Sequence, residues 1–470
     1  MKIFKRKTFN KIILFLLIAC FVIAPISVFA NEANIEYIPE EQKVFEDIPV
    51  IGCKAAYVVE PSTGKILYEK NAHEKMYPAS TTKILTALLA MEKCQMDDKA
   101  VVSQRAIDLV PEEYSGANLR VGEEIAISDL LYALLIPSAN EAANVLAEHI
   151  SGSVEEFAEL CNNRAKELGC EMLHFVNPNG IHDENHYCSA YDLYLIAKEC
   201  QKYEIFNEIV KTKKFTLPAT NMYPTTDRTF TNTNEMLLNG RYNYPSCTGI
   251  KTGHTTPAGY CFVGSSTNNG IDLITVVLGG KINAKGLNER FYDTKQLMEF
   301  VYNNYSMKEI AKENTIVAKL DVGKATKETS MLDVVIDSSF STIVPNDLDV
   351  SALDSTIELN DNIQAPIEEG QSLGKIVIHA DGVIYTADVV ASHSVEKLPY
   401  MRYNLIIIAI IILSSYFYIL VIKKSKKHRI VVIAIVLILV IAEVVGLMYI
   451  VKEVKDNSIT KTIEVINQNY

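Results

Sequence analysis

The sequence predicts an α/β (α+β) domain with an antiparallel sheet and a helical subdomain, followed by a small all-β domain and two transmembrane helices. Between residues 45 and 305, strand-like apolar segments flank a central group of segments with helical apolar spacing. Short alternating runs separated by Gly and Asp turns fill residues 312–395. Two long apolar runs finish the chain, whose 470 residues are enough for two or three structural units.

The first 30 residues are typical of a secretory signal peptide. Five basic residues precede an apolar run from Ile12 to Ala24, and Val28-Phe29-Ala30 offers small residues at the two positions that a signal peptidase reads. We therefore expect export, with cleavage after Ala30. Leu17-Ile18-Ala19-Cys20 also resembles a lipoprotein processing site, but the chain stays apolar beyond Cys20, which favours simple cleavage.

The charge balance argues against a nucleic-acid partner. The whole chain carries a formal net charge of −12, and residues 31–404 hold 32 Lys and Arg against 53 Asp and Glu. Such a surface repels phosphate backbones. Eight cysteines follow the predicted signal peptide, so an exported chain could form disulfides, yet several lie in apolar stretches and are equally compatible with buried free thiols.

The elements of the 45–305 domain follow from its apolar periodicity. Ala55–Val59 and Lys65–Tyr68 form a predicted hairpin around a Pro-Ser-Thr-Gly turn. Ser80 precedes an apolar segment with helical spacing that we expect to be a central helix. Further helices are predicted at 128–150, 153–168 and 287–304, and buried strands at 260–264 and 273–278.

The last two apolar runs are each long enough to cross the membrane. Leu405–Ile422 has 18 residues and Ile430–Val451 has 22, against the roughly 20 that a spanning helix needs. The loop between them, Lys423–Arg429, carries five Lys or Arg residues and is expected to stay in the cytoplasm. The extracytoplasmic domains and the tail from Asp456 would then lie outside. Glu443, near the middle of the second run, would be costly in lipid unless it is protonated or faces a partner helix.

Ser80-Thr81-Thr82-Lys83 is the first candidate for chemistry. Residues three apart share one face of a helix, so the Ser80 hydroxyl and the Lys83 amine can meet. A serine becomes nucleophilic when a base removes its proton, and a lysine can serve if burial or a nearby cation lowers its pKa. Four other serines in the chain have a lysine three residues later, and among the five only Ser80 opens a predicted buried helix.

Two further motifs contain suitable side chains. Ser138-Ala139-Asn140 offers a hydroxyl and an amide, although both residue types are also ordinary helix caps. Lys251-Thr252-Gly253 occurs once, beside a predicted strand, and could be either a binding element or a solvated turn. Each motif is weak alone, whereas the ordered triple is specific.

The ordered triple resembles the active-site set of serine β-lactamases and penicillin-binding proteins. Four longer segments are similar to the low-molecular-mass penicillin-binding proteins that act as D-Ala-D-Ala carboxypeptidases, and they lie at residues 77–83, 175–180, 249–255 and 258–261. The resemblance covers about residues 45–395. It implies a β-lactamase/transpeptidase-like catalytic domain at 45–305 and the small β-rich domain at 312–395.

The resemblance also implies the catalytic roles. Ser80 would attack the carbonyl of the penultimate D-alanine and Lys83 would act as general base. Ser138 would pass the proton to the leaving amine, and Asn140 would orient Lys83 and the substrate amide. No cofactor is implied. β-Lactam antibiotics would be covalent inhibitors.

The third motif is assigned to substrate binding by the same resemblance. Lys251 and Thr252 would hold the terminal carboxylate of a peptidoglycan stem peptide, beside Gly253. The backbone N–H groups of Ser80 and His254 would form the oxyanion hole. His182 and His186 form a His-x-x-x-His pair without a recognisable third ligand, so we expect loop residues there and no metal.

Two alternatives differ from a carboxypeptidase. A class A β-lactamase needs a glutamate that activates the deacylating water, and the matching letters Glu235–Asn239 lie only 16 residues before Lys251, far from the Ser-x-Asn motif. A membrane β-lactam sensor would need a cytoplasmic effector domain, whereas the longest predicted cytoplasmic piece is the seven-residue loop. The expected location is therefore the cell membrane, with an extracytoplasmic catalytic domain.

Overall fold

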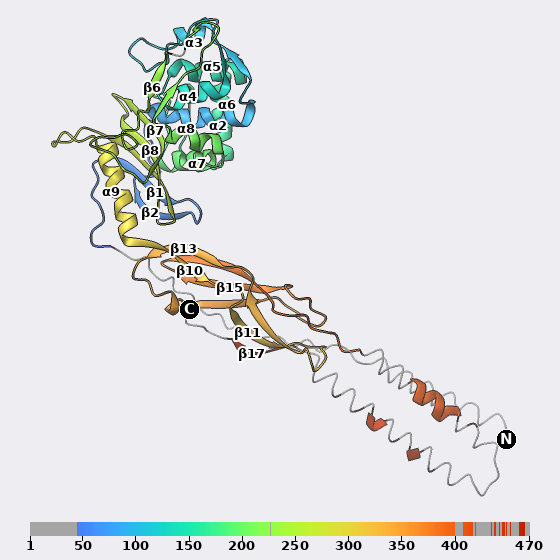
Figure 1. The fold of residues 1–470 in the computed structure, drawn as a ribbon. Helices are drawn as coiled ribbons and strands as arrows, with labels where there is room; N and C mark the ends of the chain where they lie inside the picture. The colour runs from blue at the N-terminus through green and yellow to red at the C-terminus, as the bar shows by residue number, and fades with distance from the viewer. Residues whose placement is uncertain are drawn as a thin grey trace. The chain divides into compact units, whose positions relative to one another are not determined.

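The computed structural model describes residues 45–399 apart from residue 226, residues 408–416 and 460–465, and scattered positions between 419 and 452 (Figure 1). The predicted signal peptide at 1–30 lies outside the described residues. Both predicted extracytoplasmic domains are almost completely described.

A five-stranded antiparallel sheet with strand order β2-β1-β9-β8-β7 forms the centre of the first domain. Its strands are β1 (Ala55–Glu60), β2 (Lys65–Lys70), β7 (Cys247–Thr255), β8 (Gly259–Asn268) and β9 (Ile271–Gly280). The hairpin predicted at 55–68 and the strands predicted at 260–264 and 273–278 are confirmed.

Helices cover both faces of this sheet, and the alternation along β1 shows how. Successive side chains of a strand point to opposite faces. Tyr57 and Val59 belong to the core shared with the helical subdomain, whereas Ala56 and Val58 belong to the core shared with α9 (Glu289–Asn304). All six residues of β1 are therefore buried.

The helical subdomain lies between β2 and β7 in the chain (Figure 1). Its helices are α2 (Lys83–Lys93), α3 (Gln104–Asp108), α4 (Ile127–Leu135), α5 (Asn140–Ser151), α6 (Val154–Glu167), α7 (Ala190–Cys200) and α8 (Glu204–Lys211). Two short hairpins complete it, β3 (Lys99–Val101) with β4 (Glu124–Ala126) and β5 (Lys214–Thr216) with β6 (Thr229–Thr231). The first eight residues of α2 are all buried, as expected of a central helix.

Two predicted helix boundaries are wrong in an informative way. The segment 128–150 is not one helix, because the chain breaks between α4 and α5 where Ser138 has a φ of 68°. Ser80 does not lie in the α-helix either. It belongs to a 3₁₀ turn, η1 (Ala79–Thr82), and α2 begins at Lys83.

The small β domain begins directly after α9. Its strands are β10 (Tyr305–Ala311), β11 (Ile316–Asp321), β12 (Met331–Ile336), β13 (Phe340–Pro345), β14 (Ser355–Leu359), β15 (Ser372–Ala380) and β16 (Val383–Ala391), with a 3₁₀ turn η2 (Val350–Ala352). β10 pairs with β13, and the other five join a sheet of order β14-β15-β16-β12-β11-β17. The sixth strand, β17 (Lys461–Val465), comes from the far end of the chain.

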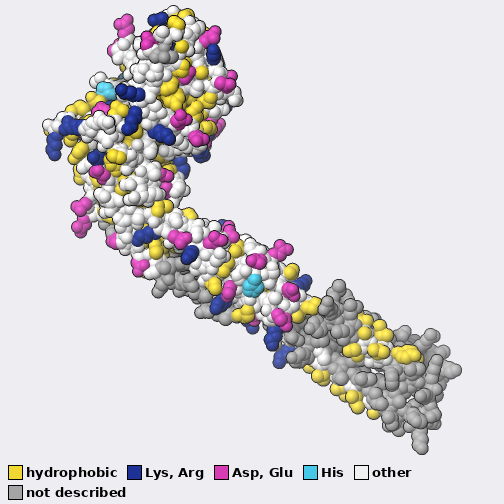
Figure 2. Space-filling view, viewed as in Figure 1, with side chains coloured by type: hydrophobic (Ala, Val, Ile, Leu, Met, Phe, Trp, Pro, Cys, Tyr) yellow, Lys and Arg dark blue, Asp and Glu magenta, His cyan; other side chains and the backbone are white. Residues whose placement is uncertain are grey.

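The predicted membrane spans at 405–422 and 430–451 lie largely outside the described residues. Among the positions that are described, no helix is both long and apolar enough to cross a membrane. The eight cysteines that follow the predicted signal peptide are all free thiols. On the face shown in Figure 2, acidic and basic side chains are interspersed over both domains.

Candidate active site

The turn that carries Ser80 is shaped by a close backbone approach. Ala79 has a φ of 49°, and Gly180 packs so tightly against it that a Cβ at Gly180 would lie 1.9 Å from the Ala79 carbonyl oxygen. Thr82 Oγ1 donates to the same carbonyl at 2.8 Å and also contacts His186 Nε2 at 2.8 Å. Ser80 is thereby held at the mouth of a cavity, one turn before Lys83.

Lys83 is fully buried and has three oxygen neighbours. Its Nζ lies 3.0 Å from Ser80 Oγ, 2.8 Å from Asn140 Oδ1 and 2.6 Å from the Asn179 carbonyl oxygen. A neutral amine has two N–H donors and one lone pair. Asn140 and Asn179 accept both protons, so the lone pair is left for the Ser80 hydroxyl. The three contacts thus suit a neutral lysine that acts as a base.

The environment of Lys83 favours that neutral form. Burial lowers the pKa of Lys83 well below its ordinary value, and the positive charge of Lys251 lowers it further. The carboxylate of Glu141 acts in the opposite direction. Burial, and then the charge of Arg290, lowers the pKa of Lys251 itself to about 7.

Asn140 is oriented by a neighbouring loop. Its backbone N–H and its Nδ2 both donate to the Ser115 carbonyl, at 3.0 and 2.8 Å, which leaves Oδ1 facing Lys83. Glu141, the next residue, fastens this loop because its Oε1 accepts from the Ala117 N–H at 2.6 Å. A Cβ at Gly116 would lie 2.9 Å from the same oxygen, so the loop packs tightly on the carboxylate.

Ser138 is buried beside Asn140, and its Oγ has no hydrogen-bond partner among the described residues. It does line the cavity. A buried hydroxyl without a partner is costly unless something else pairs with it. A proton-carrying substrate group is a suitable partner.

Strand β7 forms the opposite wall. A Cβ at Gly253 would lie 3.0 Å from the Ser80 backbone nitrogen, so this strand runs directly against the nucleophile. Thr252 faces the cavity, and its hydroxyl lies 2.6 Å from that of Thr233. Lys251 is only 1% exposed and donates to the Thr252 carbonyl at 3.1 Å, so it lies beneath the strand rather than on the cavity lining. Its predicted contact with a carboxylate stays a prediction.

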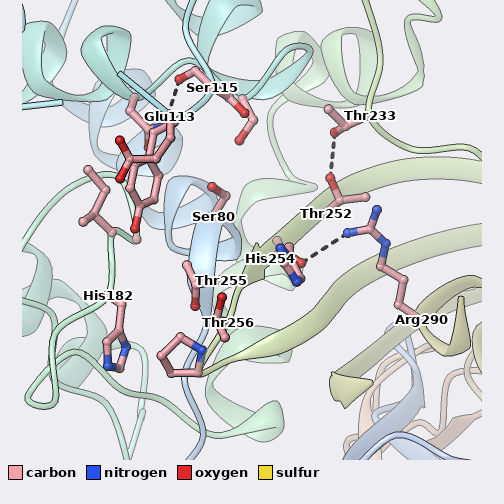
Figure 3. A pocket seen from close by; sticks show the side chains of 17 residues that line it. Ser80, Glu113, Ser115, His182, Thr233, Thr252, His254, Thr255, Thr256 and Arg290 are labelled. Carbon is pink, nitrogen blue, oxygen red and sulfur yellow. Dashed lines mark hydrogen bonds between the residues drawn. The ribbon is translucent and has the colours of Figure 1, made fainter. Parts of the chain in front are cut away.

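The cavity has a volume of about 740 Å³ and contains the remaining predicted site residues (Figure 3). Its lining comprises Ser80, Glu113, Tyr114, Ser115, Ser138, Asn140, Gly180, Ile181, His182, Thr233, Thr252, Gly253, His254, Thr255, Thr256, Pro257 and Arg290. His254 stacks on Tyr260 with 4.3 Å between ring centroids. The oxyanion hole expected from the Ser80 and His254 N–H groups stays a prediction.

Arg290 is the most important residue that sequence reasoning missed. It lies in the first turn of α9, and its Nη1 donates to the Gly253 carbonyl at 3.2 Å (Figure 3). Its buried Nε has no partner among the described residues. A cation at a helix N-terminus opposes the helix dipole, and this unfavourable position is a signal that the sequence did contain. The Asn179 carbonyl, by contrast, left no signal in residue type.

His186 is a structural residue of the site. Burial lowers its pKa to about 3, and its Nδ1 accepts from the Val176 N–H at 3.1 Å. A neutral ring with the proton on Nε2 then donates to Thr82, behind the nucleophile. His182 lies elsewhere, on the cavity lining, with its ring 4.7 Å from that of Tyr77.

A serine hydroxyl beside a buried neutral amine, under an ordered amide and an open hydroxyl, is the machinery of a serine hydrolase that works through an acyl-enzyme. A family model described as D-alanyl-D-alanine carboxypeptidase matches residues 42–282, and one described as the C-terminal domain of penicillin-binding protein 5 matches residues 305–397. The chain belongs to this carboxypeptidase family.

Relatives support the same assignment over most of the chain. The D-alanyl-D-alanine carboxypeptidase DacF of Bacillus subtilis (strain 168) is 35% identical over 358 residues, covering 74% of this chain and 87% of the relative. Penicillin-binding protein 5 from Haemophilus influenzae matches with a TM-score of 0.60 and 27% identity, over 74% of this chain and 99% of that structure. A peptidoglycan synthesis regulatory factor (PBP3) from Streptococcus pneumoniae matches with a TM-score of 0.62 and 26% identity, over 74% and 100%.

Proposed function

We propose that this enzyme removes the terminal D-alanine from peptidoglycan stem peptides that end in D-Ala-D-Ala. The observation that carries the proposal is the buried Ser80–Lys83–Asn140 arrangement, with Ser80 Oγ and Lys83 Nζ 3.0 Å apart. Ser80 Oγ bonds to the carbonyl carbon of the penultimate D-alanine while its proton passes to Lys83. The peptide C–N bond breaks, the leaving amine receives a proton through Ser138, and water then hydrolyses the ester.

The other end of the cavity suits the carboxylate of the leaving D-alanine. Arg290 is the one lysine or arginine among the described residues that line the cavity, and its Nε lacks a partner there. The paired hydroxyls of Thr233 and Thr252 lie on the same side of Ser80 in Figure 3. A guanidinium with two hydroxyls is a typical carboxylate receptor. In this arrangement Lys251 contributes through its charge beneath the strand.

The direct test is release of D-alanine from a peptide ending in D-Ala-D-Ala, together with mass spectrometry of the intact protein after treatment with penicillin. We expect one adduct, on the peptide that contains Ser80, and neither adduct nor D-alanine with Ser80→Ala. Ser62→Ala is a matched control because Ser62 also has a lysine three residues later but lies in the β1–β2 turn. Labelling that persists in Ser80→Ala, or no release by the natural enzyme, would refute the function.

We also propose that residues 1–30 direct export and that residues 405–422 and 430–451 anchor the enzyme as a membrane hairpin. Hydropathy, length and the basic loop support this topology. The pairing of β17 with β11, in which Lys461 lies opposite Asp321, also supports it. Thr460 Oγ1 additionally accepts from the Gly323 N–H at 2.9 Å and donates to the Ile363 carbonyl. A tail that joins the extracytoplasmic sheet requires an even number of membrane crossings.

Protease added to intact protoplasts tests the hairpin, with an epitope placed after Tyr470. We expect the epitope and the catalytic domain to be digested together, whereas an epitope inserted into the basic loop should be protected. Protection of the C-terminal epitope while the catalytic domain is digested would refute the topology.

A further inference from the structure

The charged side chains of the catalytic cavity stand at two opposite places. Of the described residues on its lining, Arg290 is the one lysine or arginine and Glu113 is the one carboxylate. Figure 3 shows them on opposite sides of Ser80. The cavity is therefore polar along its length, with a cation on one side of the nucleophile and an anion on the other.

The reaction fixes how a substrate runs along this cavity. If the terminal carboxylate is bound by Arg290 and the scissile carbonyl lies at Ser80, the chain before the penultimate D-alanine must continue away from Arg290. It then passes along the wall that contains Glu113, Tyr114 and Ser115. The side chain of the residue that precedes D-Ala-D-Ala is the first one to reach that wall.

The position of Glu113 is tied to the catalytic residues. It lies two residues before Ser115, whose carbonyl accepts both hydrogen bonds from Asn140. The Tyr114 N–H donates to the Pro111 carbonyl at 3.1 Å, which closes the turn around Glu113. The Glu113 carboxylate is solvent-exposed within the cavity, so it can meet an incoming cation.

We propose that Glu113 is a specificity-determining residue that binds a cationic side chain on the substrate residue preceding D-Ala-D-Ala. The preferred substrate class is then a stem peptide with a free side-chain amine at that position. This inference rests on the proposed function and names its substrate more narrowly. Because the carboxylate is exposed, the effect is that of a surface ion pair, about two- to five-fold in kcat/KM, and it should weaken as salt is added.

The test compares Nα-acetyl-L-Lys-D-Ala-D-Ala, which has a free ε-amine, with its Nα,Nε-diacetyl analogue. The natural enzyme should show a higher kcat/KM for the free amine at low salt, and the preference should shrink at high salt. Glu113→Gln should remove the preference, so that both substrates have the same kcat/KM. Glu112→Gln should keep it, because Glu112 is an exposed neighbour that does not line the cavity.

The outcomes separate this inference from the proposed function. D-Alanine release from neither substrate would refute the function itself and the inference with it. Release at equal rates by the natural enzyme, or a preference that survives in Glu113→Gln, would overturn the role of Glu113 alone. A preference lost equally in Glu112→Gln and Glu113→Gln would show a general charge effect and would also overturn it.

Discussion

Asn140→Asp changes one atom next to the catalytic base and should move the pH dependence of acylation. The new carboxylate oxygen replaces an amide oxygen that lies 2.8 Å from Lys83 Nζ. With an effective dielectric constant of about 20, Coulomb's law gives about 6 kcal/mol at this distance, or about four pKa units. The added negative charge stabilises protonated Lys83, so the pKa of Lys83 rises.

Only neutral Lys83 can take the Ser80 proton, so the acid limb of the acylation rate should shift upward by up to about four pH units. The assay is the second-order rate constant for acylation by a fluorescent penicillin across a wide pH range. The variant also loses the Nδ2 donor to Ser115, so its unfolding should be measured in parallel; a loss of about 1–3 kcal/mol is expected.

Asn303→Asp, an exposed site on α9, is the matched control and should leave the pH profile unchanged. An unshifted acid limb in Asn140→Asp would contradict the assignment of Lys83 as the base. So would loss of acylation at every pH in a variant that remains folded.

Two further predictions concern residues around the same base. Glu141→Ala removes the acceptor of the buried Ala117 N–H, so it should cost about 1–3 kcal/mol of stability in a thermal unfolding assay and slow acylation, whereas Glu141→Gln, which keeps an acceptor, should lose less. Lys251→Met removes the charge that lowers the pKa of Lys83, so the acid limb of acylation should move to higher pH. Arg290→Leu should leave that limb in place but reduce the preference for a free terminal carboxylate over its amide by about ten- to a hundred-fold, as expected for a lost charged hydrogen bond; identical responses of the two variants would refute this division of roles.

Much of the first domain could be predicted because its elements are marked locally. The β1–β2 hairpin is bounded by a clear turn, and α9 begins within two residues of its predicted start at 287. The ordered motifs identified Ser80, Asn140 and Thr252, which the structure brings to one cavity. These signals lie in short stretches of sequence, so no tertiary information was needed to find them.

The missed features depend on distant segments. Local propensity extends a helix through Ser138, and only the hydrogen bonds from Asn140 to the loop at Ser115 explain why the chain breaks there. Asn179 acts through its carbonyl, which every residue has, so its type could not reveal its role. β17 lies more than a hundred residues from its partner strand β11 and follows two apolar runs that obscure its short alternating pattern.

The free thiols have a consequence for where this enzyme can work. Burial raises the pKa of all eight, namely Cys53, Cys94, Cys161, Cys170, Cys188, Cys200, Cys247 and Cys261. Because the thiolate is the form that attacks disulfides and reacts with oxidants, thiols of this kind exchange slowly. The folded domain is thus insensitive to the redox potential of its surroundings, and it needs no thiol oxidase to reach its active form. Its folding can finish equally well in a reducing or an oxidising compartment.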